Sequence, residues 1–219
     1  MKAPTQNLLY LKDPSFPLLK KLRTKAPGTY FHSLIVAELA SGASFLFPKK
    51  ANPLLAQLGG MYHDIGKISN PQVYAENQED ANYPFQPEII ITHIQKSLEI
   101  AEAFHLPIEI KKFMATHHGS HPPPQDKKNT AQIYPGAFLP QSIEETLVML
   151  ADSCEAAVRS VQTYNKTNIS EMIHKIFQNK IKNDQLRNSV LLPNDLYQIE
   201  DVFLEIFLSL YHRRYATEN

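Results

Sequence analysis

Apolar residues recur along this chain at steps of three and four, the spacing that places them on one face of an α-helix. In the segment 29–47, one such face is formed by His32, Val36, Leu39 and Ala43. The same spacing predicts a helix over 87–104 and another over 107–118. Strand patterns, in which apolar and polar residues alternate, are nearly absent. The sequence therefore predicts an all-α fold.

Capping residues predict where other helices begin. Asn52, followed by Pro53, predicts a helix that runs into residues 63 and 64, because Asn caps helix N-termini and Pro suits the first turn. A cap residue with Glu three positions later occurs at Ser142 with Glu145 and at Asn168 with Glu171. We expect helices to begin at both places, the first ending near residue 160. Apolar spacing predicts a last helix from about residue 194.

The remaining segments are polar and punctuated by proline. Residues 1–25 are predicted to be a partly irregular lead-in with a short helix near 18–24. The segments 74–87 and 119–140 are predicted to be irregular. Since no repeat or long low-complexity tract divides the chain, we predict a single domain over residues 1–219.

Composition narrows the class of protein. The chain has 219 residues, of which 43% are apolar, and this supports a substantial core. Its 22 basic and 22 acidic residues balance, so we predict no duplex nucleic acid as a partner, because such binding normally needs a basic surplus. The single Cys154 excludes an internal disulfide framework. No apolar run reaches the roughly 18 to 20 residues that span a bilayer, and we predict a cytoplasmic location.

Seven potential metal ligands stand in apolar, helix-forming stretches: His32, His63, Asp64, His93, His117, His118 and Asp152. A lone histidine on an apolar helix face is usually a core residue with one hydrogen bond, and His32 or His93 alone would be read in that way. The adjacent pairs differ, because burying the carboxylate of Asp64 without a partner would be costly. Five imidazoles and two carboxylates together therefore indicate a metal site.

Two divalent ions are the natural division of these ligands. One ion would take His32, His63, Asp64 and Asp152, and the other would take Asp64, His93, His117 and His118. Asp64 would bridge them, and two such cations can activate a water and neutralise charge on the attacking and leaving oxygens. Histidine-rich coordination favours Mn or Fe over Mg or Ca, while Zn stays open.

Three further side chains are candidates for substrate contact. Lys67 lies three residues after Asp64, so a continuing helical turn would direct its ammonium toward the cluster, where it could stabilise charge on a phosphate. The alternative is a solvated lysine near a helix end. His121 and Arg159 are weaker candidates. An ion pair with Glu155, four residues earlier, accounts adequately for Arg159.

With these residues placed, the chain resembles the cytoplasmic HD domain of the seven-transmembrane-HD hydrolases, a group that includes cyclic di-AMP phosphodiesterases. The matching strings are APGTYFHSL at 26–34, NPLLA at 52–56, YHDIGK at 62–67, ENQ at 76–78, IIITH at 89–93, HHG at 117–119 and MLADSCEAAVRS at 149–160. The HDxGK pattern is shared by many phosphohydrolases, whereas the first and last strings are much more specific.

This resemblance implies an HD-domain helical bundle with a buried two-metal site whose ligands are the seven residues named above. It also implies that Asp64 and Lys67 are catalytic and that cyclic di-AMP is hydrolysed to the linear dinucleotide 5′-pApA. The parent protein would be anchored in the membrane. Two loops depart from the family pattern, at 79–87 and just after Gly119, and Phe31 replaces a common histidine. Because both loops would flank the substrate, the base preference stays open.

Several rival functions stay open as well. A cyclic di-GMP hydrolase of the related class would carry Gly-Tyr-Pro after its paired histidines, but here Pro122, Pro123 and Pro124 follow. A single-metal nucleotide phosphohydrolase leaves His93 and the pair after it unexplained. A di-iron oxygenase could use the same helices, and a non-enzymatic module would normally have lost several ligands. The sequence does not predict the oligomeric state or the regulator.

Overall fold

A computed structural model describes residues 5–78, 84–119 and 138–216. These residues form helices and contain no strand, which confirms the predicted all-α fold. The elements are η1 (Thr5–Lys12), α1 (Pro17–Lys25), α2 (Pro27–Ser44), α3 (Pro53–Tyr62), η2 (Ile65–Ser69), η3 (Pro71–Val73), η4 (Ala75–Asn77), α4 (Pro87–Ile90), α5 (His93–Ala103), α6 (Ile108–Thr116), α7 (Ile143–Val158), α8 (Lys166–Lys182) and α9 (Pro193–Ala216), where η marks a 3-10 helix.

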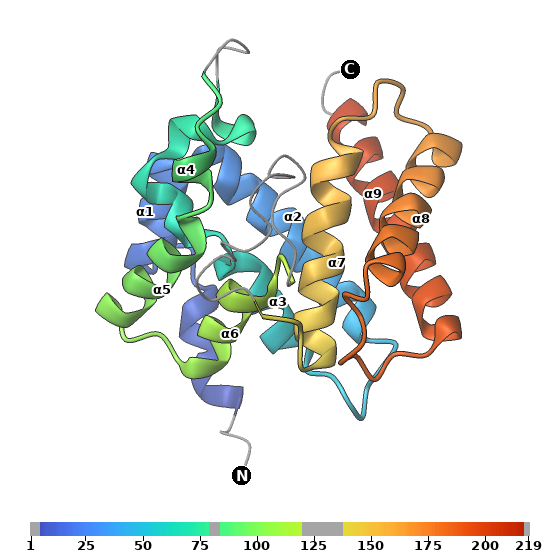
Figure 1. Ribbon diagram of the computed structural model, residues 1–219, viewed down its shortest axis with the longest axis horizontal. Helices are drawn as coiled ribbons and strands as arrows, with labels where there is room; N and C mark the ends of the chain where they lie inside the picture. Colours follow the sequence, from blue (N-terminus) through green and yellow to red (C-terminus); the bar gives the residue numbers. More distant parts are fainter. Residues whose placement is uncertain (1–4, 79–83, 120–137, 217–219) are drawn as a thin grey trace.

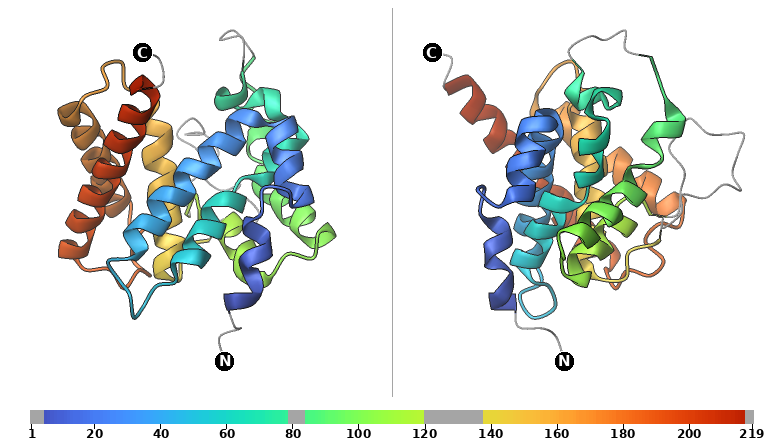
Figure 2. Two further views of the ribbon diagram at one scale, coloured as in Figure 1. Left: turned by 180° about the vertical axis from the view of Figure 1, so that it is seen from behind. Right: turned by 90° about the vertical axis from the view of Figure 1, so that its left-hand side faces the viewer.

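Helices α2, α3 and α7 form the middle of the bundle, and the other helices flank them on two sides (Figure 1). One apolar cluster fills the space among α2, α7, α8 and α9, with Leu147, Phe177 and Phe203 fully buried. A second cluster lies among α1, α2, α3 and α6, with Leu22 and Tyr62 fully buried. Figure 2 shows the helices of the bundle from behind and from the side. The candidate site residues lie between the two clusters.

The two helices that carry the first ligands pack unusually closely. A β-carbon at Gly60 of α3 would lie 2.5 Å from the backbone of Ala37 on α2, so only glycine allows this approach. Close contact of the two backbones brings His32 on α2 toward His63, which follows α3. The predicted start of α3 is also confirmed, since the Asn52 side chain accepts hydrogen bonds from two amides of the first turn.

The helix starts and breaks correct several sequence predictions. Ser142 caps α7 as predicted, by accepting from the Glu145 amide, but the Glu145 carboxylate accepts from the Gln141 amide instead of completing a capping box at Ser142. Helix α8 begins at Lys166 with Asn165 as its cap, so the predicted start at residue 168 is wrong. The short helix predicted near 18–24 is confirmed as α1, and the additional 3-10 helix η1 makes the lead-in more regular than predicted.

The predicted continuous helix over 87–104 is wrong, because it is broken at residues 91 and 92. The Thr92 hydroxyl donates to the Ile89 carbonyl, and His93 Nδ1 lies 2.7 Å from the Ile90 carbonyl oxygen. These side chains satisfy carbonyls at the end of α4 and let α5 start in a new direction. His93 is therefore the first residue of α5 rather than an interior residue.

Candidate metal centre

The structure brings all seven sequence-predicted ligands together, although they come from five separate parts of the chain. His32 and Asp152 lie on α2 and α7, while the others lie at the ends of α3, α5 and α6. They form two groups in which potential ligand atoms lie within 4.8 Å of one another: a mixed group of His32, His63, Asp64 and Asp152, and an imidazole group of His93, His117 and His118. His121 lies outside the described residues.

The histidines are oriented by backbone carbonyls. Nδ1 of His63 lies 2.8 Å from the Gly60 oxygen, and Nδ1 of His117 lies 3.0 Å from the Met114 oxygen. Because a carbonyl only accepts hydrogen bonds, each of these nitrogens is the protonated one, as is Nδ1 of His93. The Nε2 atoms therefore face inward, the position from which imidazole binds metals.

Two of the inward nitrogens face each other without a proton between them. Nε2 of His93 lies 3.3 Å from Nε2 of His117, and both rings carry a proton on Nδ1, so two neutral rings have none to share between the Nε2 atoms. Nε2 of His118 lies 3.0 Å from Nε2 of His93. A cation bound by these nitrogens would satisfy them, so the donor set fits a divalent metal ion.

Asp64 lies between the two groups, and its side chain is buried. Its Oδ2 lies 3.2 Å from Nε2 of His63, while its Oδ1 lies 3.5 Å from Nε2 of both His93 and His117. Lys67 Nζ lies 2.7 Å from Oδ2 as an ion pair, and Oδ1 has no hydrogen-bond partner within the described ranges. A buried carboxylate with one oxygen facing each group can bridge two cations.

Electrostatics separate the two groups. Burial favours neutral His63, but the nearby charge of Asp64 and contacts with Asp152 outweigh it and raise the pKa of His63 to about 10. Burial also opposes charge on His32, yet hydrogen bonds to Asp152 and Glu155 raise its pKa. In the imidazole group, burial lowers the pKa of His93 to about 4, with Asp64 opposing and His117 reinforcing the change. The mixed group therefore attracts protons, and His93 does not.

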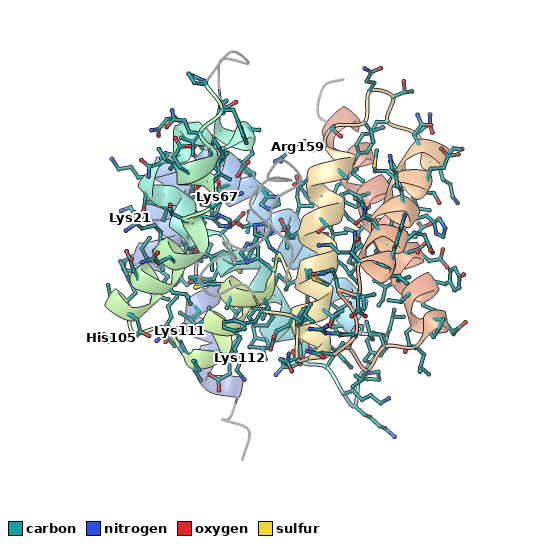
Figure 3. All side chains as sticks on the ribbon, in the orientation of Figure 1. Lys21, Lys67, His105, Lys111, Lys112 and Arg159 are labelled. Carbon is teal, nitrogen blue, oxygen red and sulfur yellow. The ribbon has the colours of Figure 1, made fainter. Side chains whose placement is uncertain are left out.

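Lys67 takes the position predicted for it, on η2 with its ammonium directed at the cluster (Figure 3). Its Nζ is shared by two carboxylates, at 2.7 Å from Asp64 Oδ2 and 2.8 Å from Glu76 Oε1, and lies 5.0 Å from the ring centre of Tyr74. Burial disfavours its charge, but Asp64 and Glu76 raise its pKa above the ordinary value. Lys67 is thus a permanent cation beside the centre.

Two acidic residues that the sequence prediction did not include lie in the same region. Glu155 Oε2 makes a short contact with His32 Nδ1 and so orients that imidazole. Its place three residues after Asp152, on the same face of α7, is the signal that could have identified it. Glu76 contacts Lys67, and only the ENQ string pointed to it. Arg159 at the end of α7 lies 3.6 Å from Glu155 Oε2, as the predicted helical ion pair requires.

Comparison with known proteins agrees with this geometry. The family model of the HD domain matches residues 29–157. An uncharacterized protein of Synechocystis sp. is 34% identical over 98% of this chain and 29% of its own length. The cyclic-di-AMP phosphodiesterase PgpH is 33% identical in both Bacillus subtilis and Listeria monocytogenes, over 96% of this chain and 32% and 31% of those proteins. The chain thus spans about a third of the length of these relatives.

Solved structures show the same likeness. The Listeria monocytogenes PgpH HD domain in complex with cyclic-di-AMP has a TM-score of 0.83 and is 32% identical, over 91% of this chain and all of that domain. The same domain in a second crystal structure has a TM-score of 0.82. The chain therefore belongs to the HD domain family. This membership confirms the predicted fold and the predicted class of metal-dependent hydrolase. In the part of the chain described here, no helix is long and apolar enough to cross a membrane.

Proposed function

We propose that this chain is a metal-dependent phosphodiesterase that hydrolyses cyclic di-AMP to linear 5′-pApA. One observation carries the proposal: two adjacent donor groups converge on Asp64 in a chain whose fold is similar to that of the PgpH HD domain crystallised with cyclic-di-AMP. The Nε2 atoms of His93 and His117, which face each other 3.3 Å apart with no proton to share, support the presence of metal independently of the similarity.

Two divalent ions, Mn or Fe, would occupy the centre. The mixed group would hold one ion, and the imidazole group with Asp64 would hold the other. Imidazole suits Mn and Fe better than it suits Mg or Ca, which prefer oxygen ligands. When bound, such ions supply an activated water and neutralise charge that develops on the phosphate.

The chain's own residues contribute orientation and charge. Nδ1 contacts to backbone carbonyls hold the rings of His63, His93 and His117 in one tautomer. Asp152 and Glu155 orient His32 from the two sides of its ring. Lys67 would donate from its ammonium to a phosphate oxygen or to the departing 3′ oxygen, where charge increases during the reaction.

The test combines metal analysis with product analysis. The pure protein is assayed for bound Mn, Fe and Zn, and then incubated with cyclic di-AMP, cyclic di-GMP or linear 5′-pApA before chromatography. We expect about two ions per chain and conversion of cyclic di-AMP to 5′-pApA, with activity lost in chelator and restored by Mn. If cyclic di-GMP is turned over at least as fast, the adenine preference is wrong. Reaction that requires dioxygen would instead support the oxygenase.

The location follows the same proposal. We infer that the chain acts as the cytoplasmic domain of a longer, membrane-anchored protein, supported by the resemblance of its motifs and by relatives about three times its length. Fractionation of cells that express the native gene, with an antibody to this domain, would test the inference. Recovery of all antigen in the soluble fraction as a chain of 24.9 kDa would contradict it.

A further inference from the structure

Glu76 is held beside the centre by three different groups. Its Oε1 accepts from Lys67 Nζ at 2.8 Å and from the Thr29 hydroxyl at 3.0 Å. Its Oε2 lies 4.0 Å from a guanidinium nitrogen of Arg159. The Glu76 side chain is only 7% exposed. The pKa of Glu76 is lowered because, although burial opposes ionisation, the charge of Lys67 outweighs it. Glu76 is therefore a buried, ionised carboxylate placed within a cluster of donors.

The backbone around Glu76 is fixed to the start of α2. The Thr29 amide, which has no partner within its own helix, donates to the Asn77 side-chain oxygen at 3.1 Å. The Asn77 amide group donates in return to the Thr29 hydroxyl at 2.8 Å. A β-carbon at Gly28 would lie 1.8 Å from the Glu76 carbonyl oxygen, so glycine is required for this approach. Glu76 therefore has a fixed position relative to His32, one turn further along α2.

Lys67 has two carboxylate partners within 4 Å in the described part of the chain, Asp64 and Glu76. Without Glu76, its ammonium would pair with Asp64 alone. Asp64 Oδ2 is the atom that faces His63 of the mixed group, so a full ion pair there would compete with a metal ion for the same lone pairs. The sharing of Lys67 between two carboxylates moderates this competition.

We propose that Glu76 is a positioning residue that draws the Lys67 ammonium partly away from Asp64. This keeps Asp64 Oδ2 available to a cation and holds the ammonium where it meets substrate phosphate. The proposal rests on the proposed function for the role of Lys67 in turnover, but its effect on metal affinity does not depend on any substrate. Glu76 acts through Lys67, so its removal should have little effect once Lys67 is absent.

A double-mutant cycle tests this dependence, with Glu76→Gln and Glu76→Ala made in the native chain and in Lys67→Ala. In the native background we expect each variant to weaken Mn²⁺ binding several-fold, measured by titration calorimetry, and to lower kcat by about tenfold with a smaller change in KM. In the Lys67→Ala background we expect the same substitutions to change both quantities less than twofold. Glu144→Gln is the matched control, since Glu144 is also a carboxylate with little exposure but accepts from the Asn52 amide, away from the centre.

The two measurements separate the failure of this inference from the failure of the proposed function. If the native chain does not hydrolyse cyclic di-AMP, the proposed function is wrong, while the Mn²⁺ titrations still test Glu76. Equal losses of Mn²⁺ affinity in the two backgrounds would overturn the inference, because Glu76 would then act independently of Lys67. Unchanged Mn²⁺ affinity in both Glu76 variants would overturn it as well. Thermal melts identify any variant that is unfolded, and Glu76→Gln, which preserves the side-chain volume, is then decisive.

Discussion

The two donor groups of the centre differ in chemistry and in support. The mixed group combines two imidazoles with two carboxylates and is held largely by α2 and α7, long helices of the main apolar cluster. The imidazole group has no carboxylate of its own and lies where the shorter α5 begins and α6 ends. Acidic neighbours raise the pKa of His63 to about 10, whereas burial leads the changes that lower the pKa of His93 to about 4.

This contrast shows how one protein can make two unlike sites from the same residue types. Carboxylates attract cations strongly, but they attract protons too, so an ion entering the mixed group must displace the proton that the raised pKa of His63 holds there. In the imidazole group, burial lowers the pKa of His93 and of His118, so these two nitrogens would bind an ion without first losing a proton. Asp64 lies next to both donor groups, so a substitution at this residue is the first test of the difference between them.

Replacing Asp64 by Ala should have the largest effect, because both groups use its oxygens. We expect metal content to fall from about two ions per chain to nearly none and turnover to be lost. Inductively coupled plasma mass spectrometry and a cyclic di-AMP assay measure the two results. Asp201→Ala, at an exposed position on α9, is the control and should keep both ions. Two retained ions with full turnover in Asp64→Ala would disprove the assignment of the site.

Replacing a single ligand should weaken metal binding in one donor group and leave the other group able to bind its ion. We expect His32→Ala mainly to weaken the ion of the mixed group and His118→Ala mainly to weaken that of the imidazole group. Each variant should keep about one tightly bound ion per chain, with turnover strongly reduced. Metal analysis after gel filtration in limiting Mn²⁺ measures the remaining ion. Loss of both ions in either variant would show that the groups form one inseparable site.

Lys67→Ala should leave both groups intact and slow the chemical step. Its ammonium is directed at developing oxyanion charge, and removal of such a donor typically costs about 10²- to 10³-fold in rate. Metal content should stay at two ions per chain, which distinguishes this variant from the ligand variants. Lys96→Ala is a suitable control, because Lys96 is a surface residue paired with Glu99 on α5. A normal kcat in Lys67→Ala would show that the ammonium takes no part in turnover.

The dependence of metal affinity on pH should be the smallest effect and the finest test of the comparison. His63 is protonated below its raised pKa of about 10, so binding in the mixed group should strengthen as pH rises. We expect a gain of about tenfold per pH unit between pH 6 and 8 for His118→Ala, where that group is intact. His32→Ala should show a weaker dependence, since His93 is already unprotonated above its pKa of about 4. Equal slopes in the two variants would remove the proposed distinction.

The sequence predicted ligands well where two of them are adjacent in the chain. It did not predict helix boundaries that depend on tertiary contacts. Paired ligands such as His63 and Asp64 stand out because two polar groups in an apolar stretch need a common explanation. The break before His93 was not predicted, because its apolar spacing continues through residues 91 and 92. Only side-chain contacts to the carbonyls of α4 reveal it. The seven residues fall into two spatial groups, and Asp64, which was predicted to serve both ions, lies in the mixed group.

The N-cap of α8 and the contacts of Glu76 could not be predicted from the sequence for the same reason. Both Asn165 and Asn168 could have capped α8, and the choice depends on which side chain reaches the amide three residues on. Asn165 does so, while Asn168 donates to the Thr163 carbonyl instead. The spacing of residues could not predict the role of Glu76, because its partner Thr29 lies 47 residues earlier in the chain. The predicted single domain over 1–219 stays a prediction.

The facing imidazole nitrogens of His93 and His117 also have a consequence for how much of this protein a cell can maintain. Two buried acceptors 3.3 Å apart with no proton between them disfavour folding, and a bound cation would reverse that penalty. A ligand that binds only the folded chain adds about 2.7 kcal/mol of stability when present at a hundred times its dissociation constant. On the proposed function, metal scarcity would therefore enlarge the unfolded fraction that proteases degrade. The supply of metal would set the abundance of the enzyme as well as its rate.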